Sequence, residues 1–243
     1  MELTHTWSAG PRTAVVWAAL REESERRNTS LVVVDVGGGT GVFAVPLAEA
    51  GHRVTVVDAS PDALAALTRR AAEAGVAGRI TGVQGDGDRL AELVVAGSAD
   101  LVLCHSLLEV VDDPAEVVRA LAATLRPGGA LSVVVANRAA AVLSRAMNGH
   151  LGAAAALLTD PQGRAGPGDK LRRRFDPSGA TALLAAAGLE VEKIHGVRVV
   201  ADLVPGAVAD ADPDALLAFE LAAAEQPPYR DIATQLHLYA RKR

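Results

Sequence analysis

The sequence predicts an α/β fold: a doubly wound, Rossmann-like sheet of seven mainly parallel strands whose C-terminal strand runs antiparallel. Three observations support this prediction. Five units of strand followed by helix succeed one another from residue 31 onward, a glycine cluster closes the first strand, and residues 235–240 alternate as an antiparallel strand does. A helical N-terminal arm and an insertion after the fifth strand complete the predicted architecture.

The first half of the chain alternates regularly between helix and strand patterns. Residues 12–27 repeat apolar positions with a helical period and predict the N-terminal helix. Residues 31–34 form a continuous apolar, mostly β-branched run, typical of a parallel strand buried on both faces. Further strands are predicted at residues 53–57, 80–84, 101–104 and 131–136, and helices at residues 42–50, 61–74, 89–96 and 114–125.

The rhythm changes after the fifth strand. Residues 138–174 form an alanine-rich, helix-like stretch, then a loop at 160–169 and a basic run at 170–174, which we interpret as an insertion over the active edge of the sheet. The remaining elements are predicted as a helix at 177–187, strands at 189–194 and 197–201, a helix within 205–224 and the strand at 235–240.

Composition limits the class of protein. The chain has 243 residues, half of them hydrophobic, so it can bury a substantial core and is not mainly disordered. A net charge of -5 argues against non-specific coating of nucleic acid or of an anionic membrane. Cys104 is the only cysteine, which excludes an internal disulfide and a multi-cysteine zinc site. No apolar run approaches the roughly 18 residues of a membrane span, so we expect a cytoplasmic protein.

The glycine loop, residues 35–41 (DVGGGTG), lies between a buried strand and a helix. Glycines there let a ligand approach the backbone, and the N-terminus of the helix faces that ligand. The spacing G-x-G-x-G, with valine at position 42, disfavours a dinucleotide site, whose fingerprint has a later third glycine. A purely structural glycine turn is the alternative.

Two carboxylates follow the next two strands. Asp58 ends the second strand, 21 residues after Gly37, close to the offset at which a carboxylate reaches a pair of ribose hydroxyls. Asp86 follows the third strand, where it can accept a hydrogen bond from an adenine amino group. Helix capping is the alternative for both, although Ser60 and Asp88 are better placed to cap.

With these motifs, residues 30–137 resemble the class I S-adenosylmethionine-dependent methyltransferases. The resemblance rests on the glycine loop, on Asp58, on Asp86 with Gly87, and on the strand segment at residues 99–105. It implies that S-adenosyl-L-methionine is the cofactor, S-adenosyl-L-homocysteine the product, and that no metal takes part. The residues implied to bind the cofactor in this core are Asp35, Gly37, Gly38, Gly39, Asp58, Ala59, Asp86, Gly87, Cys104 and His105.

The flanking segments resemble a narrower family, the tRNA 5-carboxymethoxyuridine methyltransferases, through residues 104–114, 137, 196–199 and 228–237. This resemblance implies that Arg12 contacts the cofactor and that the anticodon region of tRNA is the partner. The substrate-binding candidates within these segments are Asn137, Arg198, Tyr229 and Arg230, and Arg172 in the basic run is a further candidate because a carboxylate substrate calls for arginines. We therefore predict one methyltransferase domain at 1–243, with a helical arm at 1–29, a cofactor core at 30–137 and a substrate side at 138–243.

Methyl transfer from a sulfonium requires the nucleophile to be held in line with the methyl group, and such orientation supplies on the order of 7–11 kcal/mol. A carboxylate with a pKa near ~4 is already ionised at neutral pH and needs no base. Arginines that clamp the carboxylate are then the main requirement. His105 is the candidate for positioning or for a base, with a structural histidine as the alternative.

Some of the substrate candidates have a structural alternative as well. Arg198 is flanked by valines, so we expect it to point at a cleft or a partner. The run at residues 172–174 is alternatively a solvated helix end, and Tyr229 is alternatively a core or interface residue. Glu109, Asp112 and Asp113 are expected to cap the helix that begins at Pro114.

Charge divides unevenly between the two halves of the domain. Residues 30–137 hold 7 basic and 13 acidic residues, a net charge of -6, whereas residues 138–198 hold 9 and 5, a net charge of +4. The predicted substrate side is thus basic and suits an anionic substrate, either tRNA or a small-molecule acid or natural product. A non-catalytic module that only binds S-adenosylmethionine is the remaining alternative.

Overall fold

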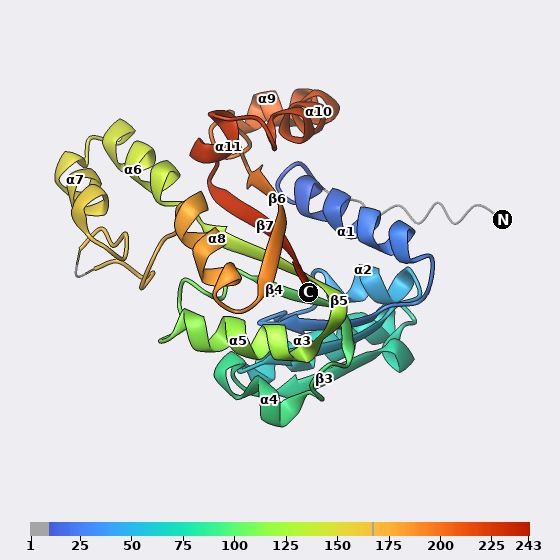
Figure 1. Cartoon of the computed structure of the whole chain (residues 1–243). Coiled ribbons are helices and arrows are strands. Elements are labelled where there is room, and N and C mark those ends of the chain that lie inside the picture. Colours follow the sequence, from blue (N-terminus) through green and yellow to red (C-terminus); the bar gives the residue numbers. More distant parts are fainter. Residues whose placement is uncertain (1–9, 167) are drawn as a thin grey trace.

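The structure, a computed structural model, describes residues 10–166 and 168–243, so the first nine residues of the predicted arm lie outside it. One seven-stranded sheet with the order β3-β2-β1-β4-β5-β7-β6 forms the centre of the molecule (Figure 1). The strands are β1 (Val32–Val36), β2 (Arg53–Asp58), β3 (Ile80–Gln84), β4 (Ala99–His105), β5 (Leu125–Ala136), β6 (Leu189–Val197) and β7 (Gln235–Lys242). β1 to β5 pair in parallel and β7 runs antiparallel to both neighbours, which confirms the predicted fold class.

Helices cover both faces of the sheet, because each strand of the parallel part alternates apolar side chains between two buried faces. α1 (Ala14–Arg27), α2 (Ala44–Glu49) and α3 (Pro61–Glu73) pack on one face, against side chains such as Val33 and Leu103. α4 (Leu90–Leu93), α5 (Pro114–Thr124) and α8 (Pro177–Ala185) pack on the other face, against side chains such as Val34 and Val102.

The strand order reverses direction between β1 and β4, where crossovers leave toward opposite sides of the sheet. In doubly wound folds, ligands bind outside the carboxyl ends of the strands at this point. The glycine loop follows β1 there, and the segment after β4 lies beside it. The topology therefore places the candidate cofactor residues at one edge of the sheet.

Helix caps follow the sequence in part. Ser60 accepts a hydrogen bond from the Ala63 amide (3.2 Å) and Asp113 accepts one from the Ala115 amide (2.8 Å), so both cap the helices that follow, as predicted. Asp88 does not cap a helix, because residues 87–89 form a 3-10 turn, η2 (Gly87–Arg89), and α4 begins without a side-chain cap. The predicted helix at 89–96 is thus shorter than expected, and the β-branched Val94 that ends it is extended.

The strand predicted at residues 197–201 is absent, since β6 ends at Val197 and Arg198 has a φ of 59°. The carboxylate of the fully buried Glu220 accepts hydrogen bonds from the amides of Val199, Val200 and Ala201, each at 2.8 Å. Those amides would otherwise serve a strand ladder. The chain therefore turns around a buried carboxylate, and Arg198 lies in a loop.

Further along, the predicted helix at 205–224 is two helices, α9 (Gly206–Ala211) and α10 (Pro213–Ala223). Asp212 separates them and caps α10 by accepting from the Ala215 amide (3.0 Å), and Pro213 occupies the first turn, where its missing N–H costs nothing. A short helix, α11 (Tyr229–Ile232), precedes β7.

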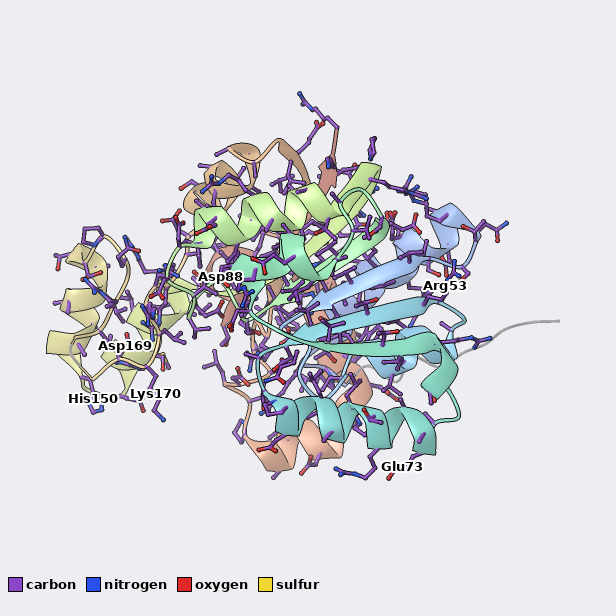
Figure 2. The ribbon with its side chains drawn as sticks, turned by 90° about the horizontal axis from the view of Figure 1, so that it is seen from below. Arg53, Glu73, Asp88, His150, Asp169 and Lys170 are labelled. Atoms are coloured by element: carbon purple, nitrogen blue, oxygen red, sulfur yellow. The ribbon has the colours of Figure 1, made fainter. Side chains whose placement is uncertain are left out.

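The predicted insertion is a lobe, residues 138–176, that contains α6 (Arg138–Met147) and α7 (Leu151–Thr159). The lobe leaves and rejoins the sheet at one place, because Arg138 donates to the Phe175 carbonyl (2.8 Å) and Phe175 donates to the Ala136 carbonyl (2.9 Å). Figure 2 shows His150, Asp169 and Lys170 on this lobe, on the side of Asp88 and away from Arg53. The lobe thus projects from the carboxyl edge of the sheet.

Among the described residues, the longest apolar helical segments fall short of what crossing a membrane requires.

Candidate methyl-transfer site

The glycine loop is folded around the carboxyl of Asp35. Gly37 and Gly39 have φ values of 74° and 55°, which favour glycine, and a Cβ at Gly38 would lie 2.5 Å from the Asp35 carboxyl. The Gly37 amide donates to the Val57 carbonyl (2.8 Å), which ties the loop to β2. Glycine is required at these positions by backbone conformation and by close approach.

Asp35 is a buried carboxyl without a full set of partners. Its side chain is 2% exposed, and its Oδ2 has no hydrogen-bond partner among the described residues. Burial, with a smaller contribution from Asp58, raises its pKa to about 7. A ligand that brings hydrogen-bond donors or positive charge to this loop would satisfy the carboxyl, and S-adenosylmethionine, with its ammonium and sulfonium groups, fits that demand.

Asp58 links the ends of β1 and β2. Its Oδ2 accepts from the Gly39 amide (2.8 Å) and its Oδ1 accepts from the Ser60 amide (2.9 Å), and Ala59 between them is exposed. Each carboxylate oxygen keeps a second lone pair. Asp58 can therefore still accept from a pair of hydroxyl groups.

The ends of three strands converge on Leu107. A Cβ added at Gly37 would lie 3.5 Å from Leu107, and one added at Gly87 would lie 3.4 Å from it. Asp86, just before Gly87, is exposed and does not cap η2. The structure thus brings the glycine loop, the Asp86-Gly87 turn and the segment after β4 together.

Cys104 and His105 end β4, and their side chains point to opposite faces of the sheet. Cys104 is fully buried in the core under α5, and burial raises its pKa, so it is a neutral thiol. Contact between Cys104 and a ligand would have to come from its backbone. His105 packs edge-on against Phe43, with ring centres 4.6 Å apart, and burial lowers its pKa to about 3. His105 is a neutral imidazole at neutral pH.

A cleft of about 470 Å³ lies next to this edge, between the lobe and the loop after β6. It is lined mainly by apolar side chains of α6, the loop and α11, among them Leu143, Leu203 and Ile232. Its polar side chains come from Asn137, Ser144, Arg145, Arg174, Asp202 and Thr234. This combination of an apolar wall with a few polar groups is typical of small-ligand sites.

Asn137 lines this cleft, but its amide serves the protein. Its Nδ2 donates to the carbonyls of Asp231 (2.9 Å) and Ala233 (2.8 Å), and its Oδ1 accepts from the Ala139 amide (3.0 Å). The side chain is 1% exposed. Both donors of Asn137 are therefore used to fix α11 to the start of α6, which leaves one lone pair for a substrate.

Arg198 and Arg12 meet at one carboxylate. The Asp202 carboxylate lies 3.4 Å from Arg198 Nη1 and 3.4 Å from Arg12 Nε. Asp202 lines the cleft, and Val199 beside Arg198 lines it too. The structure thus brings the arginine predicted for the cofactor and the arginine predicted for the substrate to the same side of the site. The predicted position of Arg198 on a strand at residues 197–201 was wrong, because β6 ends at Val197.

The arginine run after the lobe is engaged with the protein. Arg172 pairs with Asp112, and the Arg173 guanidinium donates to the carbonyls of Leu108, Val111 and Asp112. These contacts hold the segment after β4. The run is therefore not a solvated helix end, and the substrate contact predicted for Arg172 would have to replace its ion pair. Asp112 is thus an ion-pair partner and not a helix cap.

Glu109, in the same segment, does not cap α5 as predicted. It is 3% exposed, and its Oε1 accepts from the Ala136 amide (3.2 Å) at the end of β5. Its carbonyl accepts from the amides of Arg172 and Arg173. Glu109 joins β5, the arginine run and the segment after β4.

Tyr229 and Arg230 belong to α11, whose Ile232 lines the cleft. Tyr229 is 48% exposed, and Arg230 pairs with the neighbouring Asp231 (2.8 Å). A Cβ at Gly196 would lie 2.8 Å from the Arg230 Cα, so glycine permits α11 to pack on β6. Both side chains lie near the cleft, and neither is among the residues that line it.

Arg145 is a candidate that sequence reasoning missed. It lines the cleft from α6 and, among the described residues, forms neither an ion pair nor a hydrogen bond through its side chain. Arg174, the other cleft arginine, pairs with Asp169. Arg145 is thus available for an anionic ligand. Nothing in its alanine-rich neighbourhood distinguishes it in the sequence, because only the fold of the lobe brings it to the cleft.

Known proteins share this fold. A family model described as a methyltransferase domain matches residues 33–129. A solved S-adenosylmethionine-dependent methyltransferase from Mesorhizobium loti aligns with a TM-score of 0.63 and 22% identity, over 96% of this chain and 100% of its own. Magnesium protoporphyrin IX methyltransferase from Synechocystis, solved with bound S-adenosylhomocysteine, aligns with a TM-score of 0.63 and 15% identity, over 96% and 83%.

Fold, glycine loop and these matches define the class: the chain belongs to the class I S-adenosylmethionine-dependent methyltransferases and is an enzyme. Within this class it is similar to the tRNA 5-carboxymethoxyuridine methyltransferase of Escherichia coli K12, with 30% identity over 233 residues, 95% of this chain and 88% of that protein. It is also 34% identical to the ubiquinone biosynthesis O-methyltransferase of Xanthomonas axonopodis pv. citri over 165 residues, 68% of this chain and 65% of that protein.

Proposed function

We propose that the enzyme methylates the carboxylate of a 5-carboxymethoxyuridine-type wobble nucleoside in tRNA. The observation that carries this proposal is the extent of similarity to the E. coli tRNA methyltransferase, which covers 95% of the chain and so includes most of the substrate side. The match to the ubiquinone biosynthesis enzyme covers 68% of the chain. A cofactor core is common to the whole class, whereas the substrate side distinguishes its members.

Charge in the cleft supports an acidic acceptor. Arg145 is free for a carboxylate or a phosphate, and Arg198 is held by a single carboxylate, Asp202, at 3.4 Å. An arginine guanidinium binds a carboxylate through two parallel hydrogen bonds and so fixes its orientation. We assign Arg145 and Arg198 to the substrate. We assign Tyr229 and Arg230, on α11 with the cleft-lining Ile232, to contacts with the larger part of a tRNA.

The cofactor supplies the activated methyl group on its sulfonium. We assign its ribose hydroxyls to Asp58, its adenine amino group to Asp86 with Gly87, and its methionine part to the glycine loop and Asp35, with Arg12, Ala59, Cys104 and His105 as further contacts. The chain itself then has to hold the acceptor oxygen in line with the methyl group. Because a carboxylate is already ionised at neutral pH, orientation by arginines is sufficient and no acid-base pair is needed.

The test is incubation of the purified enzyme with labelled S-adenosylmethionine and two tRNA preparations, one containing 5-carboxymethoxyuridine and one from cells that cannot make it. We expect the label in the methyl ester of that nucleoside, identified by mass spectrometry after digestion, and only in the first preparation. Label in another nucleoside, or no label in either preparation, would contradict the proposal. A tRNA substrate also implies a cytoplasmic enzyme.

The similarity to ubiquinone biosynthesis enzymes favours a second candidate, a small-molecule acceptor. Salt separates the two candidates. Affinity for tRNA falls steeply with added salt because counterions are released from the phosphates, whereas affinity for a small acid changes little.

A further inference from the structure

A continuous chain of polar side chains crosses the sheet from the end of β4 to the far edge. His105 Nε2 lies 2.8 Å from Ser132 Oγ, and Ser132 Oγ lies 2.9 Å from His237 Nε2. His237 Nδ1 lies 3.0 Å from His195 Nδ1, and His195 Nε2 lies 3.2 Å from a carboxylate oxygen of Glu225. The chain passes through β4, β5, β7 and β6 in their spatial order and ends at a side chain that is 65% exposed.

The sheet register brings these residues to one face. His195 pairs with His237 across β6 and β7, and Ser132 pairs with Leu103, two residues before His105. This face lies under α1 and α2, among apolar side chains such as Leu103 and Val134. Ser132 and His237 are 0% exposed and His195 is 5% exposed. Polar groups buried this deeply need hydrogen-bond partners, and here each one is the partner of the next.

The carboxylate of Glu225 fixes the direction of every hydrogen bond between it and His105. An ionised carboxylate only accepts, so His195 carries its proton on Nε2 and accepts on Nδ1. His237 must then donate from Nδ1 and accept on Nε2. Ser132 therefore donates to His237 and accepts from the Nε2 proton of His105. The Nδ1 of His105 is left with a free lone pair, and it has no partner among the described residues.

This direction requires an uncharged His195. Burial lowers the pKa of His195, against the opposing effect of Glu225, and Lys193 lowers it further; burial also lowers the pKa of His237. Glu22, which pairs with Lys193, is the other charged group near His195. A proton on His195 Nδ1 would reverse the chain and place a proton on His105 Nδ1. At neutral pH the uncharged form, and hence the first direction, prevails.

We propose that Ser132, His237, His195 and Glu225 are positioning residues that hold His105 as its Nε2-protonated tautomer, with Nδ1 as a hydrogen-bond acceptor at the methyl-transfer site. With a lone pair on Nδ1, His105 cannot donate a hydrogen bond to the nucleophilic oxygen of the substrate and so does not weaken that nucleophile. Where the substrate oxygen still carries a proton, Nδ1 can take this proton as the new O–C bond forms and the C–S bond of the sulfonium breaks. The proposal rests on the methyltransferase class and not on tRNA as the substrate.

Nitrogen NMR of the histidine side chains tests this directly in the protein without substrate. With histidine labelled by ¹⁵N, and signals assigned by single His→Gln variants, we expect at neutral pH pure Nε2–H tautomers for His105 and His195 and a pure Nδ1–H tautomer for His237. The tautomer expected for His237 is the less common one for histidine in water. An Nε2–H tautomer, or a mixture, at His237 would overturn the proposal, whatever the methyl acceptor is.

Charge reversal at the exposed end provides the second test. Glu225→Lys replaces an obligatory acceptor by an obligatory donor, so all three tautomers should invert and His105 should carry its proton on Nδ1. Glu22→Lys is the matched control, because Glu22 is 63% exposed and pairs with Lys193, which is not one of the hydrogen-bonded side chains between His105 and Glu225. We expect unchanged tautomers in the control. Unchanged tautomers in Glu225→Lys would contradict the assigned direction.

Interrupting the chain connects it to catalysis. Ser132→Ala should leave His105 as a mixture of tautomers and lower kcat, with little change in KM for the cofactor. The loss should be at least roughly tenfold for a methyl acceptor that carries a proton, within the range of proton-transfer effects. It should be smaller for a carboxylate, where the Nδ1–H tautomer only weakens the nucleophilic oxygen by donating a hydrogen bond to it. Ser132→Thr keeps the hydroxyl and should retain most of the activity. Equal activity of wild type and Ser132→Ala, on whichever acceptor is turned over, would exclude a positioning role.

Discussion

Asp35 is the carboxyl around which the glycine loop is built, and its environment opposes ionisation. The same burial that makes Gly38 obligatory, with its would-be Cβ 2.5 Å from the carboxyl, raises the pKa of Asp35 to about 7. A site that keeps such a group costs the protein stability without its ligand and gains specificity for a ligand that brings positive charge. This connects the conformation of the loop to the class of cofactor.

The raised pKa has a consequence for stability. The folded state holds the proton of Asp35 up to about pH 7, whereas the unfolded state releases it near pH 4. The contribution of protonated Asp35 to the free energy of unfolding is therefore fully present below pH 4 and is lost as pH rises through 7. Asp35→Asn stays neutral, so relative to wild type it should gain stability across this range, by up to about 4 kcal/mol above pH 8. Urea unfolding of the cofactor-free protein at pH 5 and pH 8.5 measures this. A gain that does not depend on pH would contradict the assignment.

Two charged residues should separate cofactor binding from substrate binding. Asp58→Ala removes the carboxylate that holds Gly39 and is assigned to the ribose, so the Kd for S-adenosylmethionine should rise by about tenfold or more, as measured by calorimetry. Arg198→Ala should leave that Kd within about twofold and reduce methyl transfer by at least about a hundredfold, the cost of losing an oriented charged hydrogen bond in a closed site.

Arg12→Ala is the matched control for Arg198, because both arginines pair with Asp202. If Arg12 contacts the cofactor, this variant behaves like Asp58→Ala. If Arg198→Ala lowered the affinity for the cofactor instead, the assignment of Arg198 to the substrate would be wrong.

At the scale of elements, the loop after β6 is organised by one buried carboxylate on α10. Glu220 accepts from three consecutive amides, those of Val199, Val200 and Ala201, and so fixes the turn that carries Arg198. The loop also lines the cleft through Val199 and Leu203. A residue of α10 thus fixes the loop that lines the cleft.

Glu220→Gln should therefore affect the loop more than the sheet. The amide has a single accepting oxygen and a donor that faces amide N–H groups, so we expect a loss of about 1–3 kcal/mol in the free energy of unfolding. Faster hydrogen exchange should be confined to residues 198–204, and methyl transfer should decrease. Glu22→Gln, on exposed surface, controls for the loss of charge. Unaltered exchange of the Val199 to Ala201 amides would contradict this role.

At the scale of the whole molecule, the residues assigned to the cofactor and the residues that line the cleft belong to different halves of the sheet. The acidic half with β1 to β4 carries the loop and carboxylates assigned to the cofactor, and the lobe projects away from the sheet (Figure 1). Residues of the lobe and of the loop after β6 line the cleft. The basic residues of the second half suit the proposed anionic substrate, and the net charge of -5 argues against non-specific attraction of the whole protein to nucleic acid.

A substitution at Arg145 tests whether the cleft takes part in tRNA binding. Arg145→Ala removes a guanidinium that has no partner within the described protein, so thermal stability should stay within about 0.5 kcal/mol of wild type. Affinity for tRNA should fall, and the slope of log K against log salt should become smaller by about one if Arg145 binds a phosphate. An unchanged slope together with a lower kcat/KM would assign Arg145 to the nucleoside carboxylate instead. No change in either quantity would remove Arg145 from the site.

The parallel core was predictable because its signals are local. A β-branched run, a glycine cluster and a helical period each report on a few neighbouring residues, and β1, β2 and β4 lie within one or two residues of their predicted bounds. The substrate side was less predictable, because its structure depends on distant partners. Residues 197–201 read as a strand, yet their amides bond to Glu220, about 20 residues away. Likewise, Arg172 and Asn137 were expected to face a substrate, and the fold gave them partners of their own.

The sequence by itself determined the fold class, the glycine loop with Asp58 and Asp86, and hence the cofactor class, since these depend on short motifs at the ends of successive strands. Tertiary structure alone decided which charged groups are free and which are paired. Arg145, a single arginine in a helix, became a candidate only through its place in the cleft. His105, Ser132, His195, His237 and Glu225 are up to 132 residues apart in sequence, and only the register of β4, β5, β7 and β6 aligns them into one hydrogen-bonded chain.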